Sequence, residues 1–167
     1  YYNTSISDVA KRAKVSAGTI YIYFTDKFTL YRYLLTQYGH RIRREIAKGT
    51  QGLIDHVEIE REGLLIFLKM VRKRPHMYKI IWESLYIDGS LFKDYYESFA
   101  QRYVTQLDTM KDQVTDMDHM VLSFALMGIA NFIGLKYVFF DRDADLEYVV
   151  DEVTKFLRQG LMAPEKN

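Results

Sequence analysis

The residues best suited to chemistry in this chain form a short run near the N-terminus. The small residues Ala17 and Gly18 come first, and the bulkier Tyr21, Ile22 and Tyr23 follow them. A helix that begins with small residues can approach a DNA groove closely, and the hydroxyls and rings behind them can reach phosphates and bases. No nucleophile elbow, phosphate-binding loop or dinucleotide fingerprint occurs in the sequence, so we expect a DNA-binding protein and no enzyme.

Two short helices joined by a tight turn must position this run. Thr4 or Ser5 can cap the first helix and Ser16 the second, because a side-chain oxygen there accepts a hydrogen bond from a free backbone N–H. Apolar residues at helical spacing can pack the two helices together. These are Val9, Ala10, Ala13, Ile20 and Phe24.

The stretch from Thr4 to about Leu30, with its G-T-I-Y-x-Y-F segment and Lys27, resembles the DNA-binding domain of the TetR (tetracycline-repressor-like) transcriptional regulators. This resemblance implies an all-α fold with a helix-turn-helix head and a larger helical body that binds an effector and dimerises. It also implies two C-terminal helices that form an intersubunit four-helix bundle, and a further helix before Tyr1.

The resemblance also assigns DNA contacts. We expect them from Thr4, Ser5, Ser16, Ala17, Gly18, Thr19, Tyr21, Ile22, Tyr23 and Lys27. Hydroxyls, rings and the ammonium group would hold phosphates, and the residues at 17–19 and 22 would meet base edges. Alternatively, Tyr21 or Tyr23 packs the head against the long helix that follows. Two departures from the family pattern occur: Ala17 stands where many relatives have Lys, and Lys14 stands where Gly is usual. A left-handed backbone at Lys14 costs about 1 kcal/mol.

Charge and composition narrow the class of protein. Residues 1–50 carry nine Lys or Arg and three acids, whereas residues 51–167 carry 14 bases and 19 acids. A basic head on an acidic body indicates a polyanionic partner at one end. The hydrophobic content of 49% excludes a disordered chain, and the absence of cysteine fits a cytoplasmic protein with neither disulfides nor thiolate metal sites.

Helical patterns continue along the rest of the chain. They predict helices over 26–48, 53–74, 76–87, 91–111, 118–140 and 144–160. The first of these connects the head to the body. We therefore expect a head with its connecting helix over 1–48, and an effector-binding and dimerisation domain over 49–167.

The helix over 118–140 is unusually apolar, because residues 120–135 contain no charge. A helix that is apolar on all sides must be covered on all sides. A second copy of the chain is the favoured cover; a membrane or a monomer that buries both last helices internally are the alternatives. The segment is short for a membrane span and Lys136 interrupts it, so no membrane partner is expected. The expected dimer contacts are Val121, Gly128, Phe132, Leu135, Val149, Val153, Phe156 and Leu157.

The body is rich in aromatic residues and methionine, which could line an effector pocket or form ordinary core. The candidate pocket residues are Phe67, Met70, Trp82, Glu83, Tyr86, Phe99, Tyr103, Phe124, Met127 and Asn131. Such a lining favours a bulky hydrophobic or aromatic ligand, with Glu83 and Asn131 as the polar groups that would orient it.

The acidic spacing of Asp141, Asp143 and Asp145 imitates a calcium loop. The sixth position of such a loop requires Gly, and Leu146 stands there, so capping of the last helix is the favoured role. We therefore expect neither a metal nor another cofactor.

These observations favour a homodimeric regulator, a repressor by analogy, that binds a palindromic double-stranded operator and is released by a largely apolar effector. The alternative is an all-helical small-molecule carrier whose head has no DNA-coupled function.

Overall fold

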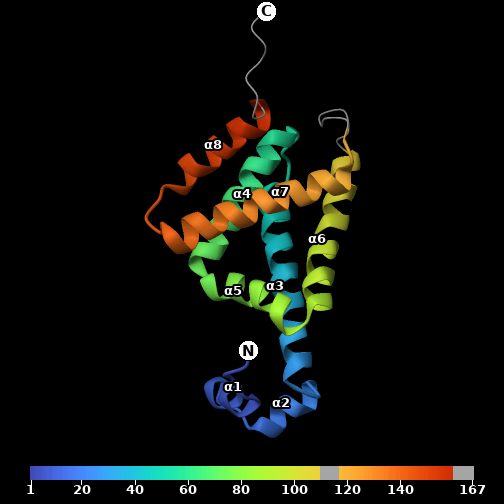
Figure 1. The fold of residues 1–167 in the computed structure, drawn as a ribbon, viewed down its shortest axis with the longest axis vertical. Helices are drawn as coiled ribbons and strands as arrows, with labels where there is room; N and C mark the ends of the chain where they lie inside the picture. The colour runs from blue at the N-terminus through green and yellow to red at the C-terminus, as the bar shows by residue number, and fades with distance from the viewer. Residues whose placement is uncertain (110–116, 160–167) are drawn as a thin grey trace, which may run out of the picture.

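The computed structural model describes residues 1–109 and 117–159, which form an all-α fold (Figure 1). The helices are α1 (Ile6–Ala13), α2 (Ala17–Tyr23), α3 (Lys27–Gly49), α4 (His56–Lys73), α5 (Pro75–Ile87), α6 (Gly89–Thr109), α7 (His119–Gly134), a π-helical continuation of α7 termed η2 (Leu135–Phe140), and α8 (Leu146–Gln159). The all-α class predicted from the sequence is confirmed, and the helix boundaries lie within about one turn of those expected.

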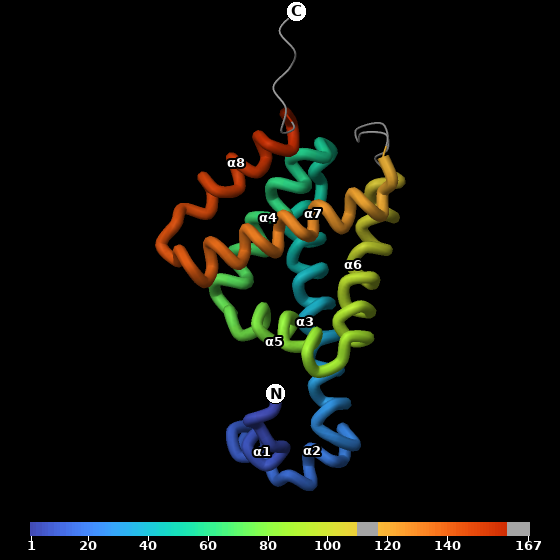
Figure 2. Tube along the Cα trace, in the orientation of Figure 1, coloured from blue at the N-terminus to red at the C-terminus, as the bar shows by residue number. Residues whose placement is uncertain are grey.

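The helices form a small head and a larger body. The head consists of α1, α2 and the first turns of α3, and α3 then continues upward into the body (Figure 1). There α4, α5 and α6 pack against α3, α7 crosses the bundle, and α8 packs along α4 (Figure 2). The long helix α3 is therefore a continuous connection between head and body.

Polar caps fix where the helices begin. Ser5 forms a capping box with Asp8 at the start of α1: the Ser5 Oγ accepts the Asp8 N–H at 3.1 Å, and the Asp8 carboxylate accepts the Ser5 N–H at 2.8 Å. Ser16 caps α2, and aspartates cap α3, α4 and α7 in the same way. Lys14, in the turn between α1 and α2, adopts the left-handed conformation with φ of 58°. This conformation is expected at a position where the family pattern usually has Gly.

Two separate cores stabilise the two parts. The head core consists of the buried Ile6, Ala10 and Ile20 with half-buried neighbours from α1, α2 and α3. A larger cluster joins α3, α5 and α6 in the body. It contains Tyr31, Leu35, Ile42, Met77, Ile81 and Leu91.

The apolar helix over His119–Phe140 is the one span in the described part of the chain that is long and apolar enough to cross a membrane. Its mean hydropathy over the most apolar window is 1.6, and 22% of that window is buried within the chain. Its last turn is a π-helix, where the Asp141 N–H donates to the Lys136 carbonyl. Arg72 donates to the carbonyls of Tyr137 and Ala144 at 3.0 and 2.9 Å, which fixes this end of the helix against α4.

Candidate DNA-binding head and effector cavity

The outer face of α2 presents large side chains to solvent. Tyr21, Ile22 and Tyr23 are 54%, 77% and 75% exposed. Because the head core already accounts for Ile20 on the opposite face, these three side chains have no packing role within the chain. An exposed isoleucine between two exposed tyrosines is suited to contact with thymine methyl groups and the flanking phosphates.

Other polar residues of the head are partly engaged within it. The Ser16 hydroxyl accepts the Thr19 N–H at 3.1 Å and shares a hydrogen bond with the Thr19 hydroxyl at 2.9 Å. The Lys27 ammonium donates to the carbonyls of Thr4 and Tyr1 at 3.0 and 3.3 Å. Lys27 therefore holds the segment before α1 against the start of α3, a structural role that the sequence pattern did not indicate. Its contact with a phosphate stays a prediction.

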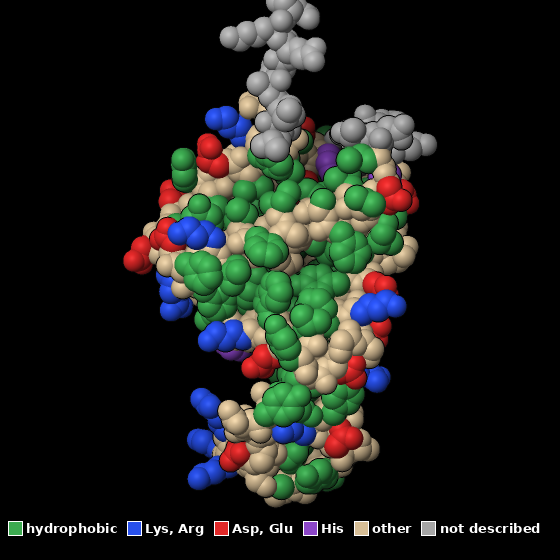
Figure 3. Space-filling view, viewed as in Figure 1, with side chains coloured by type: hydrophobic (Ala, Val, Ile, Leu, Met, Phe, Trp, Pro, Cys, Tyr) green, Lys and Arg blue, Asp and Glu red, His purple; other side chains and the backbone are tan. Residues whose placement is uncertain are grey.

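Basic side chains project from one side of the head, whereas acidic and basic groups are mixed over the body (Figure 3). The excess of six positive charges in residues 1–50 is shared between head and body, because Arg41, Arg43, Arg44 and Lys48 lie on the part of α3 that runs into the body. Basic side chains on the head are suited to attract the phosphates of duplex DNA.

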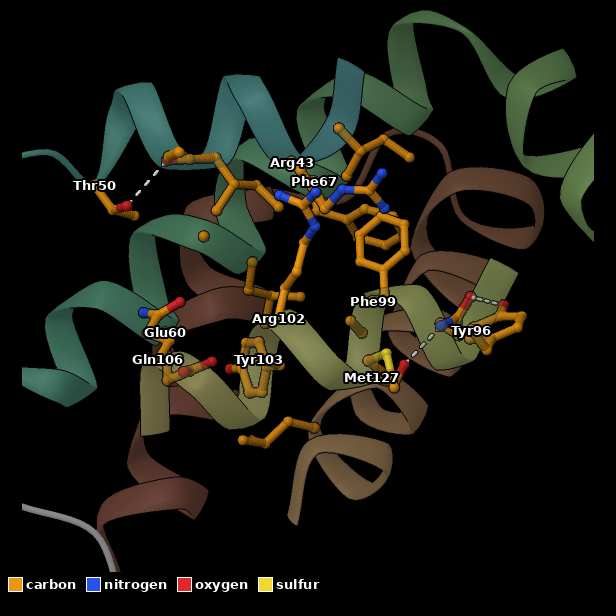
Figure 4. Close-up of a pocket in the computed structure, with 18 of the residues that line it drawn as sticks. Arg43, Thr50, Glu60, Phe67, Tyr96, Phe99, Arg102, Tyr103, Gln106 and Met127 are labelled. Atoms are coloured by element: carbon orange, nitrogen blue, oxygen red, sulfur yellow. Dashed lines mark hydrogen bonds between the residues drawn. The ribbon is translucent and has the colours of Figure 1, made fainter. Parts of the chain in front are cut away.

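The body contains a half-open cavity of about 830 Å³ that is lined by residues of α3, α4, α5, α6, α7 and α8 (Figure 4). Most of its lining is aliphatic or aromatic. The apolar lining includes Ile42, Ile46, Ala47, Ile59, Leu64, Phe67, Ile81, Tyr95, Tyr96, Phe99, Leu126, Met127, Ile129, Ala130, Val153 and Leu157. The cavity lies in the size range of small-molecule binding sites.

Two arginines meet at the seam between α3 and α6 on the wall of this cavity (Figure 4). The Arg43 guanidinium lies 4.5 Å from the ring centroid of Phe99, and its Nη1 donates to the Ser98 hydroxyl at 3.4 Å. Burial, and then the positive charge of Arg102, lower the pKa of Arg43. Within residues 1–109 and 117–159 no carboxylate forms an ion pair with either arginine. The seam therefore concentrates positive charge that an anion can neutralise.

A carboxyl group lies on another part of the cavity wall. The Glu60 side chain is 15% exposed, and burial raises its pKa to about 7, although a hydrogen bond from the Tyr103 hydroxyl opposes that shift. Its Oε1 atom is buried, has no hydrogen-bond partner and lies 3.6 Å from the Nε2 of His56. Because burial lowers the pKa of His56, this imidazole provides little positive charge at pH 7. Burial, followed by the Glu60 charge, raises the pKa of Tyr103.

A second hollow, of about 610 Å³, follows the outside of the same α3–α6 seam. Four residues line both the hollow and the cavity: His40, Arg43, Tyr95 and Arg102. Arg32 extends the positive wall of the hollow toward the head, and Asp88 and Asp94 lie on its α5–α6 side. The arginine pair thus stands where an apolar cavity meets a polar surface hollow, as a ligand with an apolar and an anionic half requires.

A polar junction joins three helices next to the cavity. The Asn131 side chain of α7 accepts a hydrogen bond from the Tyr96 hydroxyl at 3.0 Å and donates to the Met127 carbonyl at 2.7 Å. The Tyr78 hydroxyl of α5 donates to the Asn131 carbonyl. A displacement of Tyr96 by a ligand would therefore reach α7 and α5 through one residue.

Known proteins resemble this chain in its head sequence and in its whole fold. Residues 1–34 match the family of bacterial regulatory proteins described as tetR. The head is therefore similar to the regulators of that family. The matched residues cover the head. The body is compared with solved structures through its fold. No curated protein sequence matches the chain significantly.

Solved structures of bacterial regulators share the whole fold. The fatty acid degradation regulator FadR from Bacillus halodurans aligns with a TM-score of 0.85 at 20% identity, over 98% of this chain and 88% of that chain. FadR from Bacillus subtilis in complex with stearoyl-CoA aligns with a TM-score of 0.78 at 17% identity, over 97% and 91%. FadR from Thermus thermophilus in complex with lauroyl-CoA aligns with a TM-score of 0.65 at 19% identity, over 99% and 88%.

The cavity contains half of the candidate pocket residues. Those on the lining are Phe67, Phe99, Tyr103, Met127 and Asn131. The other five lie elsewhere. Glu83, Tyr86 and Phe124 are exposed, while Met70 and Trp82 pack in the neighbouring clusters. Asn131 is satisfied by its own hydrogen bonds. The charged residues on the lining are instead Arg41, Arg43, Arg44, Arg102 and Glu60.

The candidate dimer residues fall on two faces. Val121, Phe132 and Phe156 are exposed, and a side chain at Gly128 would meet nothing within 4 Å. In contrast, Val149 and Val153 are buried against α4, because the apolar stripe of α8 packs inside its own chain. Leu135 is half-buried, and Leu157 lines the cavity. Gly134 packs on Phe67, Leu68 and Tyr78 of its own chain.

Sequence reasoning missed the charged residues of the cavity wall. Arg41, Arg43 and Arg44 all line the cavity, and Arg43 is the one whose guanidinium lies over the Phe99 ring. Glu60 lies among Glu58 and Glu62, and nothing in the local pattern separates it from them. A lone carboxylate on the inner stripe of α4, spaced with Leu64 and Phe67, is the signal that could have identified Glu60.

Proposed function

We propose that this chain is a dimeric transcriptional repressor whose release from DNA is caused by a fatty acyl-CoA or a similar amphiphile with an anionic head and a long apolar chain. The observation that carries this proposal is the unneutralised pair Arg43 and Arg102 at the junction of the apolar cavity with the surface hollow. The complexes of two structural relatives with stearoyl-CoA and lauroyl-CoA support the same ligand class.

The two halves of such a ligand match the two spaces. Each methylene buried in the apolar cavity contributes about 0.8 kcal/mol. The phosphates would lie in the outer hollow, where Arg32, Arg43 and Arg102 offer planar guanidinium donors. A ligand that is charged throughout would leave the cavity empty, and one without an anion would leave the arginines unpaired.

Helix α5 connects the cavity to the head. The buried Tyr31, near the base of α3, donates its hydroxyl hydrogen to the Ile80 carbonyl of α5, and Met77 and Ile81 pack against the same part of α3. The other end of the connection is the hydrogen bond from Tyr78 to Asn131, beside the cavity. An effector that favours a shifted position of α5 therefore favours a shifted head, and DNA favours the unshifted one.

A second copy of the chain is the proposed cover for the apolar face of α7 and α8. Figure 3 shows hydrophobic side chains gathered over the face that α7 crosses. Val121, Phe124, Phe132, Phe140 and Phe156 are all more than 40% exposed there. A two-fold dimer would pair these faces and place two α2 helices about 34 Å apart, one turn of B-DNA.

The test combines DNA selection with ligand titration. A duplex that the protein binds is selected from a random library, and its affinity is measured by fluorescence anisotropy with and without stearoyl-CoA. We expect saturating stearoyl-CoA to weaken DNA binding at least tenfold, a coupling of about 1.4 kcal/mol. The double variant Arg43→Ala and Arg102→Ala should bind DNA normally and need about 100-fold more stearoyl-CoA. Arg142→Ala, at an exposed arginine away from both spaces, is the matched control.

Two outcomes would contradict the proposal. If stearoyl-CoA binds tightly and DNA affinity does not change, the chain acts as a carrier. If the double variant and Arg142→Ala respond alike, the arginine pair does not bind the anionic head.

A further inference from the structure

The cavity has two chemically different arms along α6. Figure 4 shows Phe99, Tyr96 and Met127 on one side of Arg102, and Tyr103, Gln106 and Glu60 on the other. The first arm is aromatic, and the hydrogen bond between Tyr96 and Asn131 lies beside it. The second, which we call the Glu60 arm, combines aliphatic walls with a carboxyl, a phenol and an amide. An unsubstituted acyl chain requires only the first kind of surface.

One oxygen of the carboxyl in the Glu60 arm accepts no hydrogen bond. Tyr103 donates to the other oxygen, and the buried Oε1 has only the His56 Nε2 nearby, at 3.6 Å, which is longer than a hydrogen bond. Thr50, which directly follows α3, donates its hydroxyl hydrogen to the Ile46 carbonyl at 3.0 Å, so its proton is already engaged. A buried carboxyl oxygen without a donor is unfavourable, and a cavity beside it allows a ligand to correct this.

The chemistry of Glu60 favours one kind of ligand group. Because burial raises its pKa to about 7, the carboxyl is divided between its acid and carboxylate forms at neutral pH. A ligand hydroxyl can donate to the carboxylate or accept from the acid, so it satisfies both forms. A ligand cation would be repelled by Arg102, which precedes Tyr103 in α6, and a ligand anion would be repelled by the Glu60 carboxylate.

We propose that the Glu60 arm is a subsite for a hydroxyl group, so that the effector is a hydroxylated acyl chain rather than an unsubstituted one. This inference rests on the proposed function, because Arg43 and Arg102 must hold the anionic end. Glu60 and Tyr103 are then the residues that determine specificity.

The experiment compares three acyl thioesters of equal chain length: lauroyl-CoA, 3-hydroxylauroyl-CoA and 12-hydroxylauroyl-CoA. Their affinities for the full chain are measured by isothermal titration calorimetry. We expect at least one hydroxylated compound to bind about tenfold more tightly than lauroyl-CoA, the difference that one hydrogen bond gives. The preferred isomer shows how far the subsite lies from the arginines.

The variants connect that preference to the Glu60 arm. Glu60→Leu should abolish or reverse the preference for a hydroxylated compound, because leucine packs favourably against an unsubstituted chain and offers no hydrogen-bond partner to a hydroxyl. Glu60→Gln, which keeps a donor and an acceptor, should retain part of it, and Tyr103→Phe should reduce it without altering the fold. Glu62→Leu is the matched control, since this glutamate lies two residues along α4 and outside the cavity lining.

Each further outcome is decisive. Equal affinity for all three compounds overturns the subsite and leaves the proposed acyl-CoA effector intact. A hydroxyl preference that persists in folded Glu60→Leu and in Tyr103→Phe places the hydroxyl elsewhere and also overturns it. If none of the three compounds binds, the proposed effector class fails, and the inference fails with it.

Discussion

The head and the body of this protein make their binding surfaces in opposite ways. The head fills its core completely with Ile6, Ala10 and Ile20 and exposes Ile22 and Tyr23 on a convex face. The body keeps a cavity of about 830 Å³ inside its core and places charged groups on the inner wall. The first surface depends on residues close in sequence, whereas the second depends on the relative positions of six helices. The head should therefore tolerate changes to its outer face, and the body should respond to changes far from its cavity.

The largest expected effect concerns the exposed face of the head. Ile22→Ala combined with Tyr23→Ala should weaken DNA binding about 100-fold, since each side chain contributes on the order of 1–2 kcal/mol at a groove or phosphate contact. The temperature of unfolding and the affinity for stearoyl-CoA should not change, because neither side chain packs in the chain. Anisotropy and thermal unfolding measure the two quantities. Tyr86→Ala, at a tyrosine of α5 that is 80% exposed, is the control. A loss of stability in the double variant would contradict the separation of head and body.

The second prediction uses pH to distinguish the two parts. The folded pKa of Glu60, about 7, lies above its ordinary value of 4.5, so the folded state binds the proton more tightly. The free energy of unfolding should therefore fall as pH rises from about 4.5 to about 7 and then level off, by about 3 kcal/mol in total. The head behaves oppositely: cap hydrogen bonds lower the pKa of Asp8 and Asp26, so its stability is lost as pH falls below about 4.

Urea unfolding at pH 5 and pH 8 tests this prediction. Glu60→Gln cannot titrate, so the difference between the two pH values should shrink by about 2 kcal/mol compared with the unchanged chain. The titratable groups in contact with Glu60 are His56, whose Nε2 lies 3.6 Å from its Oε1, and Tyr103, which donates a hydrogen bond to it. Burial lowers the pKa of His56 and raises that of Tyr103. An identical pH dependence in the variant would show that Glu60 is more hydrated than its burial indicates.

The same contrast explains what sequence can predict. Ser5, Ser16 and Asp26 each act on backbone groups three residues away, so the caps and the order of the head helices follow from local spacing. The cavity cannot be predicted from local spacing, because the direction of the Arg43 side chain depends on how closely α6 approaches α3. Gly39 permits this approach: a side chain there would lie 3.2 Å from both Arg43 and Tyr95. No periodicity along α3 alone reveals that contact.

The third prediction concerns the connection between the two parts. Tyr31→Phe removes the hydrogen bond to the Ile80 carbonyl and leaves the ring in place. We expect a loss of about 1 kcal/mol in stability and a fall of about fivefold in the effect of stearoyl-CoA on DNA affinity. Effector affinity and DNA affinity measured separately should stay close to those of the unchanged chain. Thr36→Val, which removes a hydroxyl bonded within α3 itself, is the control and should leave the coupling intact. Coupling that survives in Tyr31→Phe would assign it to the apolar contacts of Met77 and Ile81.

The smallest expected effect lies on the outer side of the body. Arg61 of α4 donates from its Nε atom to Asp151 of α8 at 2.8 Å and lies 3.3 Å from Glu147, which also binds Lys69 at 2.8 Å. These groups are largely exposed, so Arg61→Ala should lower stability by less than about 1 kcal/mol, and less still at high salt. Val150→Ala, at a fully buried position of α8, should cost about twice as much or more at any salt concentration. Because α8 lines the cavity through Val153 and Leu157, a large loss of effector affinity in Arg61→Ala would mean that ion pairs, rather than the apolar stripe of α8, position that wall.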